Sequence, residues 1–572
     1  MRKKAKSENI DIVTLTVINN ALVNICREMG TAMMRTSYSP IFNEALDFSC
    51  VIFNPRGEMI GQAEFCPTML GSAQYAVKWT IEELGLDSFE RGDVVIHNDP
   101  YRGQCHMPEH MVLKPVFFDD GLKFFVANIA HIGEIGGMAP GSFASDATEV
   151  YQEGLRLPPI KIMSRGEYVQ DVWKIILSNH RTPKSSWGDL HAMIGSLSIA
   201  EARLVKLLER YGAKFLAVVG DRLLDYSERW MRAEIREIPN GVYHAKDCME
   251  DDGITTQPVW MRLKLIVKDD EIIADWRESD PQARGPINAT FVATAAATYN
   301  GVLHMTNREI PRNSGCYRPI RVLTKPGTLV NVRHPGPSVG GNTETHPHMQ
   351  NVVVAALSQA IPERAAAAEG GTACNFLFGG IHPETGEYYT NYHFEGCGWG
   401  ATATHDGNSV MNNVNGNCRN TPVEVFETKY PFFTLEYSLR QDSGGVGKHR
   451  GGLGSSRKLR VMAPEITVSA LSDRTRTHAW GLFGGGGGGS GALFVKKRGD
   501  NRFGTFSEVF GTVSPTKFTR ILLREGDEVI IESPGGGGYG PARERSKDAI
   551  REDIRQGYIS AKAGRDLYAN NS

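Results

Sequence analysis

Residues 110–133 read HMVLKPVFFDDGLKFFVANIAHIG, two β-rich runs joined at Asp119-Asp120-Gly121. A glycine-containing turn between two apolar runs is a strong hairpin signal, so we predict a β-hairpin here. Antiparallel pairing about this turn places positions whose numbers sum to about 240 opposite each other. We therefore expect Glu109 to face His131 at the open end of the hairpin.

The segment that leads into the hairpin is rich in side chains that bind metals. Divalent metals prefer imidazole and carboxylate ligands, usually three or four, brought together from strand ends and loops. The first quarter of the chain supplies Glu44, Asp47, His97, Asp99, His106, Glu109, His110, His131 and Glu134. Spacing alone leaves two readings open, a metal site or a set of ordinary core and surface residues. His110 is the weakest candidate, because strand alternation from Glu109 points it to the other face.

Outward from the hairpin, the chain alternates between helical and strand patterns. The predicted elements are a helix over 12–36, a hairpin turn at 54–57, a helix over about 72–84 and two amphipathic helices within 197–236. From residue 241 the pattern changes to strands and turns, with further hairpin signals and frequent glycine. The tail from residue 543 returns to a charged helical pattern.

These patterns predict an α+β fold. We expect an N-terminal mixed helix and hairpin domain that carries the metal site, followed by a β-rich, glycine-punctuated C-terminal region. The predicted domains are residues 1–238, 239–542 and a helical tail at 543–572. More than one domain is expected, because 572 residues exceed the roughly 250–300 at which a single core stops growing.

Composition excludes several classes of protein. Lysine and arginine total 63 against 65 acids, a formal charge of -2, so no nucleic acid or anionic membrane partner is expected. We find neither an apolar run of about 18 residues nor the apolar core of a signal peptide, and we expect a cytoplasmic protein. The nine cysteines form no CxxC pair, which indicates neither a zinc ribbon nor a disulfide framework.

Two glycine tracts stand out, GLFGGGGGGSG at 481–491 and SPGGGGYGP at 533–541. Exposed backbone amides in such tracts can cradle phosphates. Neither tract matches the GxxxxGK[ST] loop, and neither clearly leads from a strand into a helix. We therefore expect tight structural turns, with a phosphate loop as the alternative, and we predict no ATP site in this chain.

Motifs spread over nearly the whole chain include DFSC (47–50), NDPYRG (98–103), EVYQEGLRLPPIK (149–161), GGNTET (340–345) and RQDSGGVGKHRGGLG (440–454). In these motifs the chain resembles the hydantoinase B family. That family includes the B-type half of 5-oxoprolinase and the related subunit of acetone and acetophenone carboxylases.

The resemblance implies a catalytic, metal-containing subunit that works beside a hydantoinase A type ATPase subunit. The partner would bind ATP and phosphorylate the substrate. Carried over motif by motif, the implied metal ligands are Glu44, His106, Glu109 and His131, and zinc, manganese or iron would fit them. In GGNTET, Asn342 and Glu344 either line a cleft or form a polar turn that caps a helix over 346–360.

The chain departs from the family pattern at several of these positions. Ala45 stands where the family has arginine, and Ile132 stands where it often has a second histidine. Cys105 replaces threonine, while Glu109 and Glu134 replace aspartates and keep the negative charge. We expect metal binding to survive these changes, and the lost polar groups favour a more apolar substrate than a hydantoin.

The leading functional hypothesis is ATP-dependent opening of a cyclic amide, such as a hydantoin, 5-oxoproline or a lactam, within a hetero-oligomer. Asp99 and Glu134 are the candidate general bases. The first alternative is a subunit of an ATP-dependent ketone carboxylase of the acetone or acetophenone type. The second is a metal-stabilised scaffold whose partner carries out all the chemistry.

Overall fold

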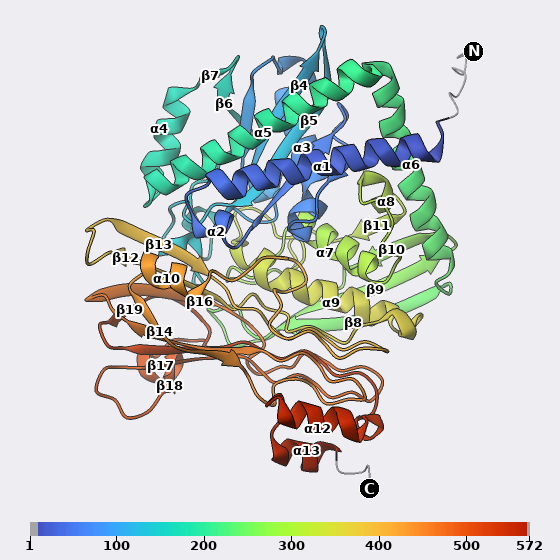
Figure 1. Cartoon of the computed structure of the whole chain (residues 1–572). Coiled ribbons are helices and arrows are strands. Elements are labelled where there is room, and N and C mark those ends of the chain that lie inside the picture. The colour runs from blue at the N-terminus through green and yellow to red at the C-terminus, as the bar shows by residue number, and fades with distance from the viewer. Residues whose placement is uncertain (1–9, 569–572) are drawn as a thin grey trace.

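In the computed structural model, which describes residues 10–568, the predicted hairpin forms the centre of a seven-stranded sheet (Figure 1). Glu109 pairs with His131, which confirms the predicted register. The strand order is β2-β1-β5-β4-β3-β6-β7. The strands are β1 Phe48–Phe53, β2 Met59–Gln62, β3 Val94–His97, β4 Glu109–Phe118, β5 Gly121–His131, β6 Ile160–Ser164 and β7 Glu167–Tyr168. Residues 1–9 and 569–572, which belong to the predicted N-terminal domain and tail, lie outside the described residues.

Helices cover both faces of this sheet. Helix α1 (Ile12–Thr36), which matches the predicted helix, lies beside α5 (Pro183–Tyr211) across one face, and α3 (Pro67–Leu84) packs on the other. Alternation along β1 divides its side chains between two buried clusters, with Ile52 on the α1 side and Phe53 on the α3 side. The strands are therefore nearly continuous apolar runs, as expected for a sheet buried on both faces.

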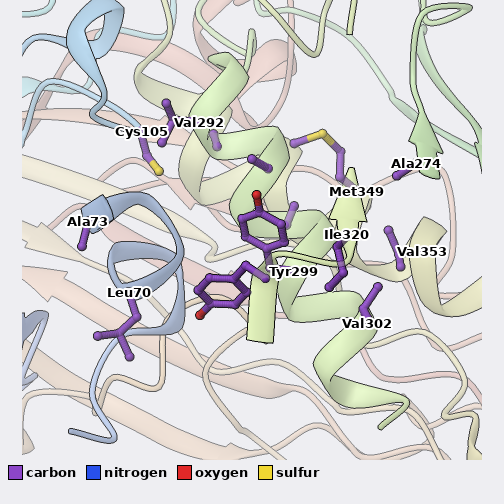
Figure 2. Close-up of a cluster of buried hydrophobic side chains, with 14 of the residues drawn as sticks. Leu70, Ala73, Cys105, Ala274, Val292, Tyr299, Val302, Ile320, Met349 and Val353 are labelled. Carbon is purple, nitrogen blue, oxygen red and sulfur yellow. The ribbon is translucent and has the colours of Figure 1, made fainter. Parts of the chain in front are cut away.

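Further layers follow beyond α3. Helix α7 (Phe291–His304) packs on α3, and α9 (His346–Leu357) packs on α7 and on a four-stranded sheet. Figure 2 shows this core around Tyr299 and Met349. The sheet has the order β11-β10-β9-β8. Its strands are β8 Gly241–Met249, β9 Val259–Lys268, β10 Glu271–Asp275 and β11 Ile320–Leu323, and the remaining helices of this part are α2 Pro40–Asn43, α4 Gln170–Asn179, α6 Ala213–Arg236 and α8 Ser314–Tyr317.

One hydrophobic core crosses the predicted boundary at residues 238 and 239. Met231 and Ile235 of α6 belong to the same buried cluster as Met261 of β9 and Met349 of α9. The two amphipathic helices predicted within 197–236 are present as α5 and α6, and α5 begins earlier than predicted. The sheet β8–β11 thus shares its packing with the N-terminal part of the chain.

The C-terminal part is β-rich, as predicted. Two sheets, with orders β13-β12-β16-β19 and β14-β15-β20-β17-β18, bury a shared apolar cluster that includes Phe378, Val468, Leu459 and Val529. The elements are β12 Asn375–Ile381, β13 Tyr388–His393, α10 Val423–Lys429, β14 Phe432–Leu439, β15 Ser455–Val461, β16 Glu465–Leu471, β17 Ala492–Lys496, β18 Gly504–Thr505, α11 Phe506–Phe510, β19 Lys517–Arg524, β20 Glu528–Glu532, α12 Lys547–Arg555 and α13 Ala561–Tyr568. Among helices within residues 10–568, none is both long and apolar enough to cross a membrane.

The 481–491 tract contains a tight turn, closed by the Gly485 amide and the Leu482 carbonyl (2.9 Å), but the 533–541 tract is not the tight turn that we predicted. Successive amides of the 533–541 tract bond to different neighbouring segments, Gly536 N to Gly452 O (2.9 Å), Gly537 N to Ala368 O (2.8 Å) and Gly538 N to Gly486 O (2.9 Å). Each of these amides bonds to a different neighbouring segment, so the tract is irregular backbone packed between several other segments. These amides already donate hydrogen bonds within the protein, so they are not available to bind a phosphate.

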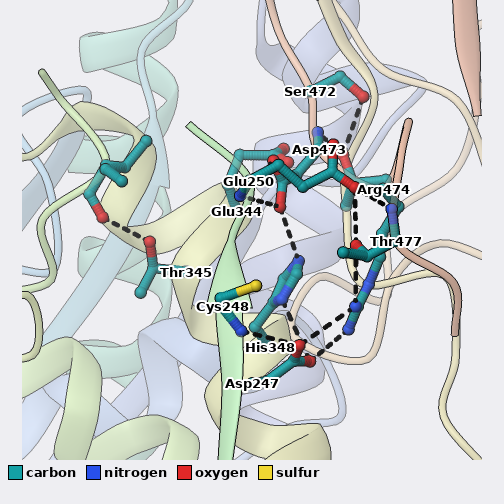
Figure 3. A network of polar contacts seen from close by, with 12 residues as sticks. Asp247, Cys248, Glu250, Glu344, Thr345, His348, Ser472, Asp473, Arg474 and Thr477 are labelled. Carbon is teal, nitrogen blue, oxygen red and sulfur yellow. Dashed lines mark hydrogen bonds and ion pairs between the residues drawn. The ribbon is translucent and has the colours of Figure 1, made fainter. Parts of the chain in front are cut away.

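A buried ionic network joins the two parts of the chain (Figure 3). Arg474, which follows β16, pairs with Asp247 of β8, and the neighbouring Asp473 pairs with Lys517 of β19. His348 of α9 lies between the two aspartates, 3.3 Å from Asp247 and 3.5 Å from Asp473. Because each buried charge has an opposite charge beside it, the cluster can be tolerated in the interior.

Candidate functional site

The open end of the β4–β5 hairpin brings three predicted ligands together. Glu109 begins β4 opposite His131 at the end of β5, and His106 lies in the turn that precedes β4. The His106 Nε2 to Glu109 Oε1 distance is 3.6 Å, and the imidazole centroids of His106 and His131 are 5.2 Å apart. The three side chains are buried.

The structure brings Asp47 to this cluster, whereas Glu44, the fourth ligand implied by the family resemblance, lies outside it. Asp47 precedes β1, whose first residue pairs with Ala130, and the His131 amide donates to the Asp47 carbonyl (3.1 Å). Asp47, Glu109 and His131 line one small cavity, and Glu44 is not among the residues that line it. Glu44 ends helix α2, where its carboxylate interacts with Lys429.

Residues far along the chain hold the cluster in place. His106 Nδ1 lies 2.9 Å from the Val339 carbonyl, so it donates there and leaves Nε2 with a free lone pair. The Asn342 amide donates to Glu109 Oε1 (2.7 Å). Asn342 belongs to the π-helical turn η5 (Gly341–Thr345), a type of local distortion that is frequent at functional sites.

An aromatic side chain covers the other side of His131. The ring of Tyr392, from β13, stacks on the His131 imidazole with centroids 4.4 Å apart and planes at 15°. The Tyr392 hydroxyl donates to Asn375 Oδ1 (2.8 Å), and Asn375 Nδ2 donates to Glu344 Oε1 (2.7 Å). Of the two GGNTET residues weighed above, Asn342 reaches the cavity directly and Glu344 supports its wall.

Burial sets the protonation of the cluster. It lowers the pKa of His106 to about 4 and that of His131 well below its ordinary value, and the charge of His106 adds to the effect on His131. Burial also raises the pKa of Glu109 well above its usual range, reinforced by the charge of Asp47. It raises the pKa of Asp47 to about 7, partly offset by a hydrogen bond from Cys418. Neutral imidazoles beside two carboxylates form a donor set suited to a cation.

Unpartnered atoms show where such a cation would fit. Nε2 of His106, both ring nitrogens of His131 and Oε2 of Glu109 are buried without a hydrogen-bond partner. Buried polar atoms without partners are rare in folded proteins and call for an explanation such as a bound ion. Within residues 10–568, no three His, Cys, Asp or Glu side chains are already arranged around one point as a finished metal site. The donor types and their burial therefore fit a metal, and coordination would require the side chains to close around it.

The two predicted general bases lie elsewhere. Asp99 is an N-cap that accepts from the Tyr101 amide (2.9 Å) and pairs with Arg102. Glu134 accepts from the Gly141 amide (3.0 Å) and from Arg181 Nη1 (3.0 Å). Both carboxylates are engaged in holding loops, and neither lines the cavity of Glu109 and His131.

The two other histidines of the candidate pool are buried but point away from the cluster. His110 Nδ1 lies 3.1 Å from the Pro108 carbonyl, and its ring neighbours His180, in agreement with strand alternation. His97 ends β3, and its nearest polar contact is Gln104. Neither ring lines the cavity of Glu109 and His131, and the buried Nδ1 of His97 has no hydrogen-bond partner.

A family model described as Hydantoinase B/oxoprolinase matches residues 11–542. An uncharacterized protein of Methanocaldococcus jannaschii is 36% identical over 97% of this chain and 95% of its own length. The caprolactamase subunit beta of Pseudomonas jessenii is 32% identical, covering 98% of this chain and 96% of that protein. A crystal structure of the ATP-dependent caprolactamase from Pseudomonas jessenii superposes with a TM-score of 0.90 at 30% identity, covering 98% of this chain and 96% of that one.

Proposed function

This chain belongs to the hydantoinase B/oxoprolinase family, and from that premise we propose that it is the metal-binding, hydrolytic subunit of an ATP-dependent enzyme that opens cyclic amides. A hydantoinase A type ATPase subunit is the proposed partner and binds the ATP. The name of the relative from Pseudomonas jessenii, a subunit beta of caprolactamase, supports both the reaction class and the hetero-oligomer.

The observation that carries the proposal is the buried cluster at the hairpin end. His106, His131 and Glu109 have buried lone pairs there that no protein group uses, and Asp47 lines the same cavity as Glu109 and His131. We propose Asp47, His106, Glu109 and His131 as the metal ligands, with zinc, manganese or iron as the ion. A bound divalent ion supplies Lewis acidity, which polarises a carbonyl group and acidifies water.

Other residues of this chain orient the proposed metal ligands. The Val339 carbonyl fixes the tautomer of His106, and Asn342 holds one oxygen of Glu109 while the other stays free. Such outer partners align ligands before the ion arrives. Tyr392 packs flat on His131 and excludes water from that face. The proposed ligands are thus aligned before a phosphorylated amide reaches them.

The proposed substrate is a ring amide more apolar than a hydantoin. Ile132, which follows the ligand His131, is buried and lines a larger pocket beside the site. An isoleucine side chain offers no hydrogen bond to a second carbonyl or ring nitrogen, which favours a simple lactam. The ATP-dependent step that activates the ring would take place on the partner.

The test is metal analysis of the purified complex together with substrate-stimulated ATP turnover. We expect about one divalent ion per site and stimulation by lactams, with hydantoin and 5-oxoproline as further substrates to compare. Substitution His106→Ala is expected to remove the ion and to lower ring opening by at least about a hundredfold.

Two results would overturn the proposal. Stimulation solely by a ketone with bicarbonate would assign the chain to a ketone carboxylase. Full turnover by a metal-free His106→Ala complex that assembles normally would leave this chain as a scaffold.

A further inference from the structure

The cavity lined by Glu109 and His131 is too small for the substrate. Its volume is about 30 Å³, room for only a few water molecules. A ring amide of six or seven members cannot enter it. If ring opening takes place there, the substrate has to be held in an adjoining volume.

Such a volume lies directly beside the cavity. A pocket of about 600 Å³, within the usual range for small-molecule sites, is lined by Ile132, Glu134, Asn391, Tyr392 and Lys429 among others. Tyr392 lines both volumes, and Ile132 follows His131 in the chain. The ring of Tyr392, stacked on His131, therefore forms the partition between pocket and cavity.

The inner part of the pocket combines an apolar wall with an unused hydrogen-bond donor. Ile41, Ile132 and Tyr392 supply the apolar wall. Asn391, which is 6% exposed, has a buried Nδ2 without a partner. It belongs to β13, the edge strand of its sheet, so half of the backbone groups of this strand are also free of sheet pairing.

Glu134 and Asp189 already have hydrogen-bond partners in the pocket, and its two exposed lysines have only loose ones, since Glu44 and Asp189 act on Lys429 through their charges. Glu134 pairs with Arg181, and Asp189 accepts from the amides of Tyr38 and Ser39. Lys184 and Lys429 are exposed at the mouth. The Lys429 ammonium has a single long hydrogen bond, 3.4 Å to the Tyr38 carbonyl, and Lys184 lies 3.9 Å from the exposed Glu387.

We propose that this pocket is the substrate chamber and that it binds the cyclic amide in its O-phosphorylated form. The ring lies against Ile132 and Tyr392, the phosphoryl group faces Lys429 and Lys184 at the mouth, and Asn391 donates to an oxygen of the ligand. Rotation of Tyr392 then joins chamber and cavity. This assignment rests on the proposed function and names the substrate form that the site accepts.

The test uses N-phosphonomethyl-valerolactam, a stable phosphonate lactam, with the full-length chain. Calorimetry or NMR titration is expected to show binding that is weakened about tenfold to a hundredfold by Lys429→Met, as for a lost charge-assisted hydrogen bond. Lys429→Arg keeps the charge and most of the affinity. Thr390→Trp, which fills the chamber, abolishes binding. Lys174→Met, an exposed lysine outside the chamber, is the matched control and leaves the affinity unchanged.

Equal affinity of the wild type, Lys429→Met and Thr390→Trp, or the absence of any binding to the wild type, would overturn the assignment. So would inorganic phosphate or plain valerolactam binding as tightly as the combined ligand. Circular dichroism and the metal content of each variant show that the fold and the neighbouring site are intact. Failure of the proposed function is distinguishable, because it appears as unchanged ring opening in the metal-free His106→Ala complex, whatever the chamber variants do.

Discussion

Asp47 and Glu44 are three residues apart, but the fold gives them different surroundings. Asp47 lies beside the His131 strand end and is buried, whereas Glu44 is half-buried near Lys429. Side-chain position relative to the sheet, and not proximity in sequence, decides which carboxylate can serve as a ligand.

This difference predicts a contrast between two amide variants. Asp47→Asn should lose most of its bound metal and at least about a hundredfold in ring opening, because it removes a charged ligand from a buried site. Glu44→Gln should keep both the metal and the activity. Elemental analysis and turnover of the two reconstituted complexes check this, and a metal-free Glu44→Gln protein would reverse our assignment.

Glu153 supports the same site indirectly, through the backbone segment that holds His106. Its carboxylate accepts from the amides of Ser338 (2.6 Å) and Val339 (2.8 Å), and the carbonyl of Val339 receives the His106 hydrogen bond. Burial raises the pKa of Glu153 to about 8 despite these hydrogen bonds. The folded state therefore holds this proton more tightly than the unfolded chain does.

The consequence is a dependence of stability on pH. A carboxyl group whose pKa is raised on folding contributes stability below its unfolded pKa, near 4.5, and loses that contribution as pH rises towards the folded value. We expect the free energy of unfolding to fall by a few kcal/mol between these limits, and Glu153→Gln to remove that part of the slope. Urea unfolding over this pH range measures it. Asp146→Asn, an exposed acid nearby, should leave the slope unchanged, and an unaltered slope in Glu153→Gln would contradict the prediction.

At the scale of elements, the glycine tracts form close backbone packing. A Cβ added at Gly536 would lie well inside the contact distance of the Trp399 carbonyl. By contrast, Gly195 lies exposed in the middle of helix α5 with no atom near its Cβ position. Replacing glycine with alanine is therefore expected to have opposite effects on stability at these two positions.

We predict that Gly536→Ala destabilises the protein by about 3 kcal/mol or more, because rigid backbone cannot move aside. Gly195→Ala should stabilise it by up to about 1 kcal/mol through higher helix propensity. Thermal or denaturant unfolding of both variants provides the measurement. A Gly536→Ala protein as stable as the wild type would show that the tract can spread to admit a side chain.

At the scale of the whole molecule, buried charges tie the β8–β11 sheet to the C-terminal sheets. Arg474 and Asp247 form an ion pair with both side chains nearly inaccessible (Figure 3). Lys517 and Asp473 form a second buried pair. The apolar core likewise crosses from the N-terminal part into β9 and α9. We expect these parts to unfold together.

Removing one partner from this network should lower the free energy of unfolding. Arg474→Met leaves Asp247 buried beside one histidine, and we predict a loss of about 3–5 kcal/mol in the free energy of unfolding. Arg476, whose side chain is 53% exposed, is the matched control, and Arg476→Met should cost at most about 1 kcal/mol. Unfolding followed by fluorescence and circular dichroism should give one shared transition, and two separated transitions in the wild type would contradict this view.

Local sequence patterns were sufficient for much of the fold. The long apolar periodicity of 12–36 predicted helix α1, and the Asp119-Asp120-Gly121 turn fixed the register that sets Glu109 opposite His131. Both succeed because helical periodicity and hairpin pairing depend on residues close in sequence. His106 was already a candidate from the residues, the resemblance to the family implied that it is a ligand, and the structure places it beside them.

Tertiary packing decided the rest of the candidate site. Asp47, Asn342 and Tyr392 reach the hairpin end from a strand start, a π-helical turn and an edge strand that are far apart in the chain. Local sequence patterns do not determine which loops will meet. The residues alone therefore left Glu44 and Asp47 both as candidates, the family resemblance implied Glu44, and neither identified Tyr392. The sequence by itself determined the hairpin and its donor types; only the folded chain decided which donors share a cavity, because that depends on how separate layers pack against each other.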